Sequence, residues 1–252
     1  MKKTLSILLA IFMLLSLAAC GEERNIGMKE KEKTTDTPTT NSPIIEPTAP
    51  YTEPVSEGDI TANDSLVNKK VKVEFGTLTD EYYDSETIRV RVDYPEDWFI
   101  RGIAETAYLN GISADELRDN LDEFAQDNQV TYLFYAANEQ TGDSINIVLE
   151  NLELSGSGGM TSKEYVDAVV GLLEDEYEKM DGVEDFTINT TEYYDENGDY
   201  YGISVSADIT GGNKLDQDVI CIPVNNRYIS CVTVTAVNEK EENSLLKYVH
   251  TL

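Results

Sequence analysis

The stretch Thr161–Met180, TSKEYVDAVVGLLEDEYEKM, decides the fold of this chain. Thr161 and Glu164 form a capping box at its start, and Gly182 is suited to end it. The apolar residues between recur at three- and four-residue steps, which places them on one face of an α-helix: Val166, Val169, Val170, Leu173, Tyr177 and Met180. Such a face must be buried, so we expect this helix to lie across a β-sheet.

Alternating apolar and polar residues predict strands on both sides of the helix. Upstream, we expect strands at 71–75, 88–94, 130–137 and 144–152, and a helix at 113–127 behind a second capping box, Ser113 with Glu116. Downstream, we expect a four-stranded meander at 185–194, 200–209, 217–224 and 227–237, then a helix at 241–249. This order favours an α+β domain, an antiparallel β-sheet flanked by helices.

The second expected strand ends at Pro95, and Trp98 follows. A strand ending in Pro-x-x-Trp, then a hairpin, a long helix and a four-strand meander, resembles the PsbP-like domains, a family of α-β-α sandwiches. The resemblance covers about Asn68–Leu252. It implies a non-catalytic binding or assembly module, and it carries over none of the family's partners because their contact residues have no match here.

Residues 1–19 have the layout of a bacterial export signal, with two lysines and then an apolar or small run from Leu5 to Ala19. Leu17-Ala18-Ala19-Cys20 matches the lipobox of bacterial lipoproteins at all four positions. We expect cleavage between Ala19 and Cys20 and a diacylglyceryl anchor on Cys20, with palmitate-type chains, on the extracytoplasmic side of the cell membrane. A transmembrane helix fits worse, because Leu5–Ala19 would rise about 22 Å against a hydrocarbon core of ~30 Å. An ordinary secretory signal with an incidental cysteine also fits worse.

Residues 20–66 are expected to be the lipidated cysteine and a disordered tether, because five of the seven prolines lie between Thr34 and Pro54 and apolar residues are few. The globular domain is expected over 67–252. The net charge is −29, and from Thr61 onward 13 Lys and Arg stand against 39 Asp and Glu. This field repels polyanions, so we expect no nucleic-acid partner. Its simplest role is to keep an exported domain soluble.

Catalytic signatures are weak. The sole histidine, His250, is third from the C-terminus, a poor place for a Ser-His or Cys-His nucleophile pair. Acidic residues are too numerous for a glycosidase pair to stand out. The glycines at 156–159 precede the helix but lack the Gly-Lys-Ser/Thr ending of a phosphate loop. We therefore expect no enzyme activity and no cofactor.

One candidate metal site is Asp195, Asn197 and Asp199, which mimic the opening of a calcium loop. An EF-hand would next need glycine where Tyr200 stands and glutamate where Ser206 stands. An acidic hairpin turn is therefore the stronger interpretation.

Paired tyrosines at 82–83, 193–194 and 200–201 place one ring on each face of a strand or turn. Their simplest role is ordinary packing, but exposed outer rings would form a patch of the sort that binds proteins or glycans. Trp98, Tyr194 and Tyr201 are the candidate contacts. The leading hypothesis is a lipid-anchored, non-enzymatic binding or assembly module for a protein or envelope component. The alternative is an accessory lipoprotein that binds a cation or small solute.

The remaining cysteines, Cys221 and Cys231, flank a turn at Asn225-Asn226. A two-residue loop would set Cys221 opposite Ser230, with the two sulfurs on opposite faces, whereas a three-residue loop would set it opposite Cys231. The sequence leaves both registers open. A disulfide is compatible with the second register, and two free buried cysteines are the alternative.

Overall fold

The computed structural model describes residues 72–195, 198–238 and 245–252. The signal, Cys20 and the tether lie outside these ranges. The side chains of 195–199 also lie outside the description, and with them the predicted calcium ligands Asp195, Asn197 and Asp199. No helix in the described ranges is long and apolar enough to cross a membrane.

A seven-stranded antiparallel sheet forms the centre of the domain, in the order β4-β5-β6-β10-β9-β8-β7. Its strands are β4 (Phe99–Ile100), β5 (Val130–Ala137), β6 (Ser144–Asn151), β7 (Val183–Asp195), β8 (Gly198–Ile209), β9 (Asn213–Pro223) and β10 (Tyr228–Val237). The predicted hairpin and four-strand meander are thereby confirmed, with ends that differ by a few residues. A short helix, α6 (Leu152–Ser155), follows β6.

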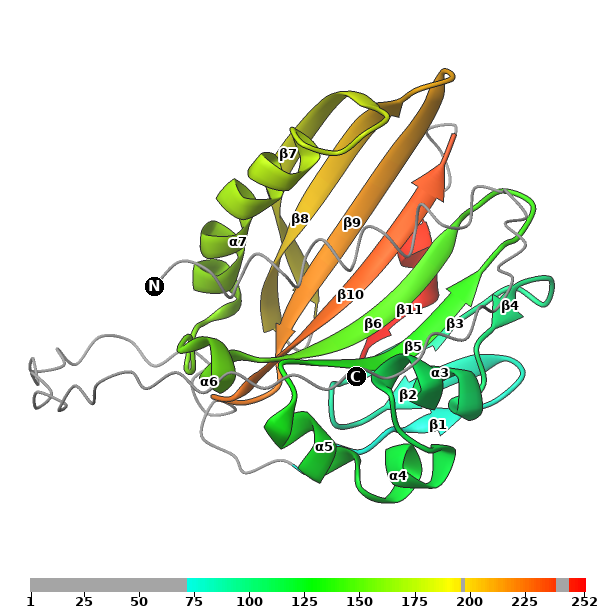
Figure 1. Cartoon of the computed structure of the whole chain (residues 1–252), viewed down its shortest axis with the longest axis vertical. Helices are drawn as coiled ribbons and strands as arrows, with labels where there is room; N and C mark the ends of the chain where they lie inside the picture. Colours follow the sequence, from blue (N-terminus) through cyan, green and yellow to red (C-terminus); the bar gives the residue numbers. More distant parts are fainter. Residues whose placement is uncertain (1–71, 196–197, 239–244) are drawn as a thin grey trace, which may run out of the picture.

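A smaller sheet packs on one face of the large sheet, in the order β1-β2-β3-β11. Its strands are β1 (Thr77–Leu78), β2 (Tyr82–Ser85), β3 (Val90–Asp93) and β11 (Val249–Thr251). Beside it in Figure 1 lie α3 (Ile103–Asn110), α4 (Ala114–Asp119) and α5 (Leu121–Asp127). The core between the two sheets is aromatic in part, with the Tyr83 ring stacked on Phe134 at 5.0 Å.

The helix α7 (Ser162–Tyr177) packs on the opposite face, against β7, β8 and β9. Its capping box forms as predicted, since the Glu164 backbone N–H donates to Thr161 Oγ1 and the Thr161 N–H donates to the Glu164 carboxylate. The apolar stripe of α7 is buried against Ile203 and Val205 of β8. Burial of each large apolar side chain contributes roughly 1.5–3 kcal/mol. The domain is therefore α+β, with an antiparallel sheet covered in part on both faces.

Several local predictions were wrong. Val73 and Phe75 are buried in the predicted alternation, but residues 72–76 form no strand. The chain turns at Gly76, where φ is +87° and a Cβ would lie 2.4 Å from the Asp84 carbonyl oxygen. Pairing with β2 begins only at Thr77. The strand predicted at 88–94 is shorter, because only Val90–Asp93 pair with β2.

The predicted helices also differ at their ends. The helix expected over 113–127 is interrupted at Asn120, whose φ of −127° is not helical, so α4 and α5 are separate. Helix α3 was not predicted. Helix α7 ends at Tyr177, before Gly182. At the C-terminus, Leu245–Tyr248 form a 3₁₀ turn, η1, that leads into β11, in place of the expected helix; residues 241–244 of that prediction lie outside the described ranges.

The β9–β10 pairing has the second of the two registers that the sequence left open for the cysteines. Cys221 lies directly opposite Cys231, and a three-residue loop, 225–227, joins the strands. Asn225 Oδ1 fixes the loop by accepting from the backbone N–H groups of Arg227 and Tyr228 at 2.7 and 3.0 Å. Both cysteines are free and buried.

Candidate functional site

Trp98 does not offer an exposed aromatic surface, which corrects its place among the candidate contacts. Its indole is 7% exposed and lies in the core, with its ring 6.3 Å from that of Tyr248. The next residue, Phe99, points the other way and is 42% exposed. Trp98 lies in the bend between Pro95 and β4, where its backbone N–H donates to the Pro95 carbonyl, and no periodicity in the sequence indicates which way a side chain in such a bend points.

Tyr194 and Tyr201 lie on the same face of the large sheet, near the start of α7. Tyr194 is 68% exposed, and its hydroxyl bonds the Glu192 carboxylate. Glu192 is directly opposite Tyr201, which is half-buried under Lys163, with Nζ 5.7 Å from the ring centre. We call these four residues, Lys163, Glu192, Tyr194 and Tyr201, the Tyr194 cluster. Of the other predicted outer rings, Tyr82 lies on the small sheet and does not join it.

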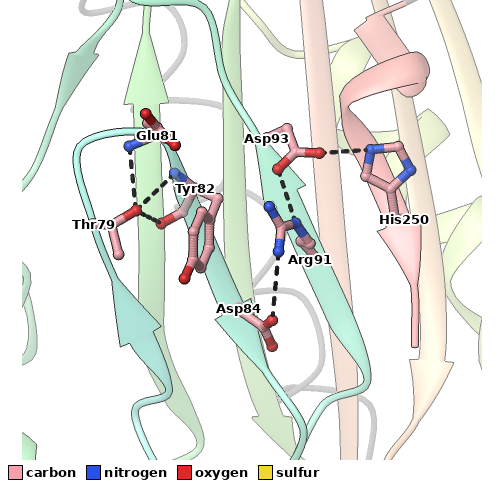
Figure 2. Close-up of polar contacts among 7 residues, drawn as sticks. All are labelled: Thr79, Glu81, Tyr82, Asp84, Arg91, Asp93 and His250. Atoms are coloured by element: carbon pink, nitrogen blue, oxygen red, sulfur yellow. Dashed lines mark hydrogen bonds and ion pairs between the residues drawn. The ribbon is translucent and has the colours of Figure 1, made fainter.

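A ladder of charged side chains runs over the outer face of the small sheet (Figure 2). Arg91 of β3 pairs with Asp93, Nε to Oδ1, at 2.8 Å, and its guanidinium lies 4.0 Å from the Tyr82 ring centre. His250 of β11 approaches the other Asp93 oxygen at 3.1 Å, and Asp84 of β2 lies 4.0 Å from Arg91. The ladder joins three adjacent strands, but its members are partly exposed, so each pair contributes less than about 1 kcal/mol.

A groove of about 770 Å³ adjoins this ladder, where the described chain begins. Its walls are the segment 72–78, the turn 84–87, the first residue of α3, the end of α4 and the first residue of α5. Charged groups of both signs line it, namely Glu74, Asp84, Glu86, Asp119, Lys72 and Arg118. A lining of this kind suits a small charged solute or a cation.

The helix side of the large sheet is only half covered. Helix α7 contacts β7, β8 and β9, and α6 contacts β10. Helix α3 lies along the edge of β5, where the Asn110 amide bonds the backbone of Tyr132 at 2.9 Å. Within the described ranges, no helix lies over the middle of β10, β6 and β5 on this side (Figure 1).

Hydroxyl and amide side chains, all of them buried, occupy this part of the sheet, over which no described helix lies. They come from neighbouring strands in register, with Tyr135 opposite Asn146, Asn146 opposite Thr233, and Ser144 opposite Thr235, which is opposite Gln217. We call these six residues the hydroxyl–amide face. At its edge the Arg101 guanidinium lies over the Tyr135 ring, 4.5 Å from the centre. None of the six carries a charge, on a chain that is otherwise strongly acidic.

Two hydroxyls of this face have no hydrogen-bond partner among the described residues. Ser144 Oγ and Thr233 Oγ1 are shielded from solvent and unpaired, whereas Thr235 Oγ1 accepts from Gln217 Nε2 at 2.9 Å. An unsatisfied buried hydroxyl costs about 1–3 kcal/mol and requires an explanation. No described helix lies over these two hydroxyls. Their unused hydrogen-bonding groups suit a partner that packs on this face and bonds to them.

A buried polar cluster lies beside this face, under the first turn of α7. The Tyr165 hydroxyl donates to Glu150 Oε2 at 2.5 Å and lies 3.6 Å from Cys231 Sγ. Glu150 is 3% exposed, and its Oε1 has no partner in the ranges that the structure describes. Burial raises the pKa of Glu150, since the charged carboxylate loses its hydration, and the bond from Tyr165 only partly offsets this.

The sequence did not single out the hydroxyl–amide face, because its residues read as ordinary strand positions. The signal that was present is the run of small polar residues at positions on one face of β6 and β10. No cluster of three or more His, Cys, Asp or Glu placed to hold a metal occurs in the described part of the chain.

Comparison with known proteins adds little. No family model matches the sequence, and no curated protein matches it. Among solved structures, the chain is similar to the solution structure of cyanobacterial PsbP (CyanoP) from Synechocystis sp. PCC 6803. The identity is 8%, the match covers 68% of this chain and 92% of that one, and the TM-score is 0.36. This likeness is too low to assign the chain to that fold.

Proposed function

We propose that this protein is a bacterial lipoprotein, anchored through Cys20 on the extracytoplasmic side of the membrane, whose folded domain is a non-enzymatic binding module for a protein or envelope component. The lipobox at 17–20 supports the anchor. A PsbP-like sandwich remains the proposed finer fold, on the strength of the Pro95-to-Trp98 motif and the element order.

The hydroxyl–amide face is the observation that carries the binding role. Its uncharged donors and acceptors, with Tyr135 at one edge, suit a neutral ligand rich in hydroxyl or amide groups. The hydroxyls of Ser144 and Thr233 have hydrogen-bonding capacity that none of the described residues uses. The Tyr194 cluster offers a second aromatic contact on the same side of the sheet.

A test of this role uses the full-length acylated protein and purified cell-wall sacculi as the probe. Asn146→Ala should lower co-sedimentation at least several-fold, because it removes an amide from the middle of the face. Asn189→Ala is the matched control, since Asn189 is exposed on β7 and its side chain lies on the opposite face. Equal co-sedimentation of both variants would refute the assignment of the face. Crosslinks from position 146 to residues before Lys72 would identify the chain's own tether as the occupant.

The anchor is tested separately. Cys20→Ser should abolish incorporation of labelled lipid and leave the precursor uncleaved by the lipoprotein peptidase. Lipid incorporation equal to that of the parent would refute the anchor, whatever the folded domain binds.

The groove beside α4 favours the alternative, a cation or small-solute lipoprotein. Calcium can be tested directly at the predicted turn, by replacing Asp195, Asn197 and Asp199 with alanine. A true site would stabilise the parent alone, by about 2.7 kcal/mol at 100 times the dissociation constant. We expect instead a weak response shared by both proteins, as ordinary acidic surface would give.

A further inference from the structure

Cys221 and Cys231 are placed as partners at the centre of the large sheet. They lie directly opposite each other on the antiparallel strands β9 and β10, so their side chains lie on the same face of the sheet. Opposed residues in antiparallel pairs have Cα atoms about 4.5 or 5.5 Å apart, and disulfides bridge Cα atoms about 4.4–6.8 Å apart. Both spacings are therefore compatible with a bond between the sulfurs without movement of the strands.

We propose that Cys221 and Cys231 form a cross-strand disulfide in the mature protein, made during folding outside the cytoplasm; this rests on the proposed export. Each thiol loses its hydrogen and one Sγ–Sγ bond forms. Two electrons and two protons pass, in net, to the disulfide of a thiol oxidase, which is reduced to two thiols. The oxidant belongs to the compartment into which the protein is exported.

Burial determines when this bond can form. Cys221 is 0% exposed and Cys231 is 6% exposed, and Tyr165 of α7 covers the pair. Thiolate is the reactive form, and the neighbouring thiol together with burial raises the pKa of Cys221, so little Cys221 thiolate is present in the folded protein. Oxidation must therefore precede the docking of α7 on the sheet, and a disulfide once formed is protected from reductants by the same helix.

The loop geometry supports this order of events. The bond closes the short hairpin 221–231, whose turn is already fixed by Asn225. A hairpin forms in about 1–10 μs, far faster than a sheet of seven strands is completed. The two thiols can thus meet while they are still accessible.

Thiol trapping in intact cells tests the proposal. Cells that export the full-length protein are lysed and denatured in the presence of a thiol-alkylating reagent, so that buried free thiols also react, and the protein is examined by mass spectrometry before and after reduction. We expect Cys221 and Cys231 to resist alkylation until reduction, and their joined peptide to lack two hydrogen atoms. Alkylation of both without reduction would overturn the proposal. Alkylation of Cys20 alone would instead contradict the lipid anchor, so the two failures are distinguishable.

A second measurement tests the timing. Protein that is reduced in denaturant and refolded with reductant should be oxidised by glutathione disulfide at least tenfold more slowly than the denatured chain. The oxidised form should have a Tm at least about 5 °C above that of the reduced form. The variant with Cys221→Ala and Cys231→Ala is the control, because its Tm should not respond to reductant. Equal Tm values for oxidised and reduced wild type would refute a native cross-strand bond.

Discussion

Two threonines on one strand, Thr233 and Thr235, provide a sharp test of the hydroxyl–amide face. Both are fully buried on β10, and both side chains lie on the helix side of the sheet. Thr235 Oγ1 accepts from Gln217 Nε2 at 2.9 Å, whereas Thr233 Oγ1 has no partner in the described part of the chain. Replacement by valine removes the same hydroxyl in each case and nearly preserves the shape.

The two substitutions should change stability in opposite directions. Thr233→Val removes an unsatisfied hydroxyl whose burial costs about 1–3 kcal/mol, so the free energy of unfolding should rise by about 1 kcal/mol or more. Thr235→Val leaves the buried Gln217 amide without its acceptor, so stability should fall by a similar amount. For a domain of this size, each kcal/mol moves Tm by about 2–4 °C.

Urea unfolding of the chain from residue 20 onward, in a Cys20→Ser background, measures both effects. The single tryptophan, Trp98, is buried and reports unfolding by fluorescence. If the face binds a ligand, Thr233→Val should also weaken co-sedimentation with sacculi although it stabilises the protein. Destabilisation by Thr233→Val as large as that by Thr235→Val would show that the hydroxyl has a partner, and the argument for an unfilled hydrogen-bonding face would fail.

Three further predictions follow from single positions. Burial raises the pKa of Glu150 above its ordinary value of 4.5, so the native state holds the proton more tightly and stability should fall as pH rises above that value; Glu150→Gln should remove this dependence in urea titrations between about pH 4 and 8. Tyr194→Ala should weaken partner capture but hardly move the unfolding midpoint, since the ring is 68% exposed; a large loss of stability with intact capture would show it to be structural. Gly202→Ala should cost about 2 kcal/mol or more in thermal unfolding, because a Cβ would lie 2.2 Å from the Val219 carbonyl oxygen, and a neutral effect would contradict that close approach.

The sequence alone determined the elements whose pattern is local. The capping box and apolar stripe of α7 and the alternation in β5 to β10 predicted helix, strands and class correctly, because each depends on residues a few positions apart. The sequence also limited the β9–β10 hairpin to two registers, one with Cys221 opposite Ser230 and one with Cys221 opposite Cys231. The lipobox, the tether and the acidic turn remain predictions, since they lie outside the described side chains.

Tertiary structure decided what depends on distant segments. The small sheet joins β3 to β11, whose partners are as far apart as Val92 and Val249, and no local periodicity encodes that pairing. Trp98 was expected near a binding rim and is core, because the bend after Pro95 turns its ring toward Tyr248, which comes from the other end of the domain's sequence. The hydroxyl–amide face exists for the same reason. The side chains of Thr233 and Val205 both point to the α7 side of the large sheet. Helix α7 crosses β7, β8 and β9, so it covers Val205 but does not lie over Thr233.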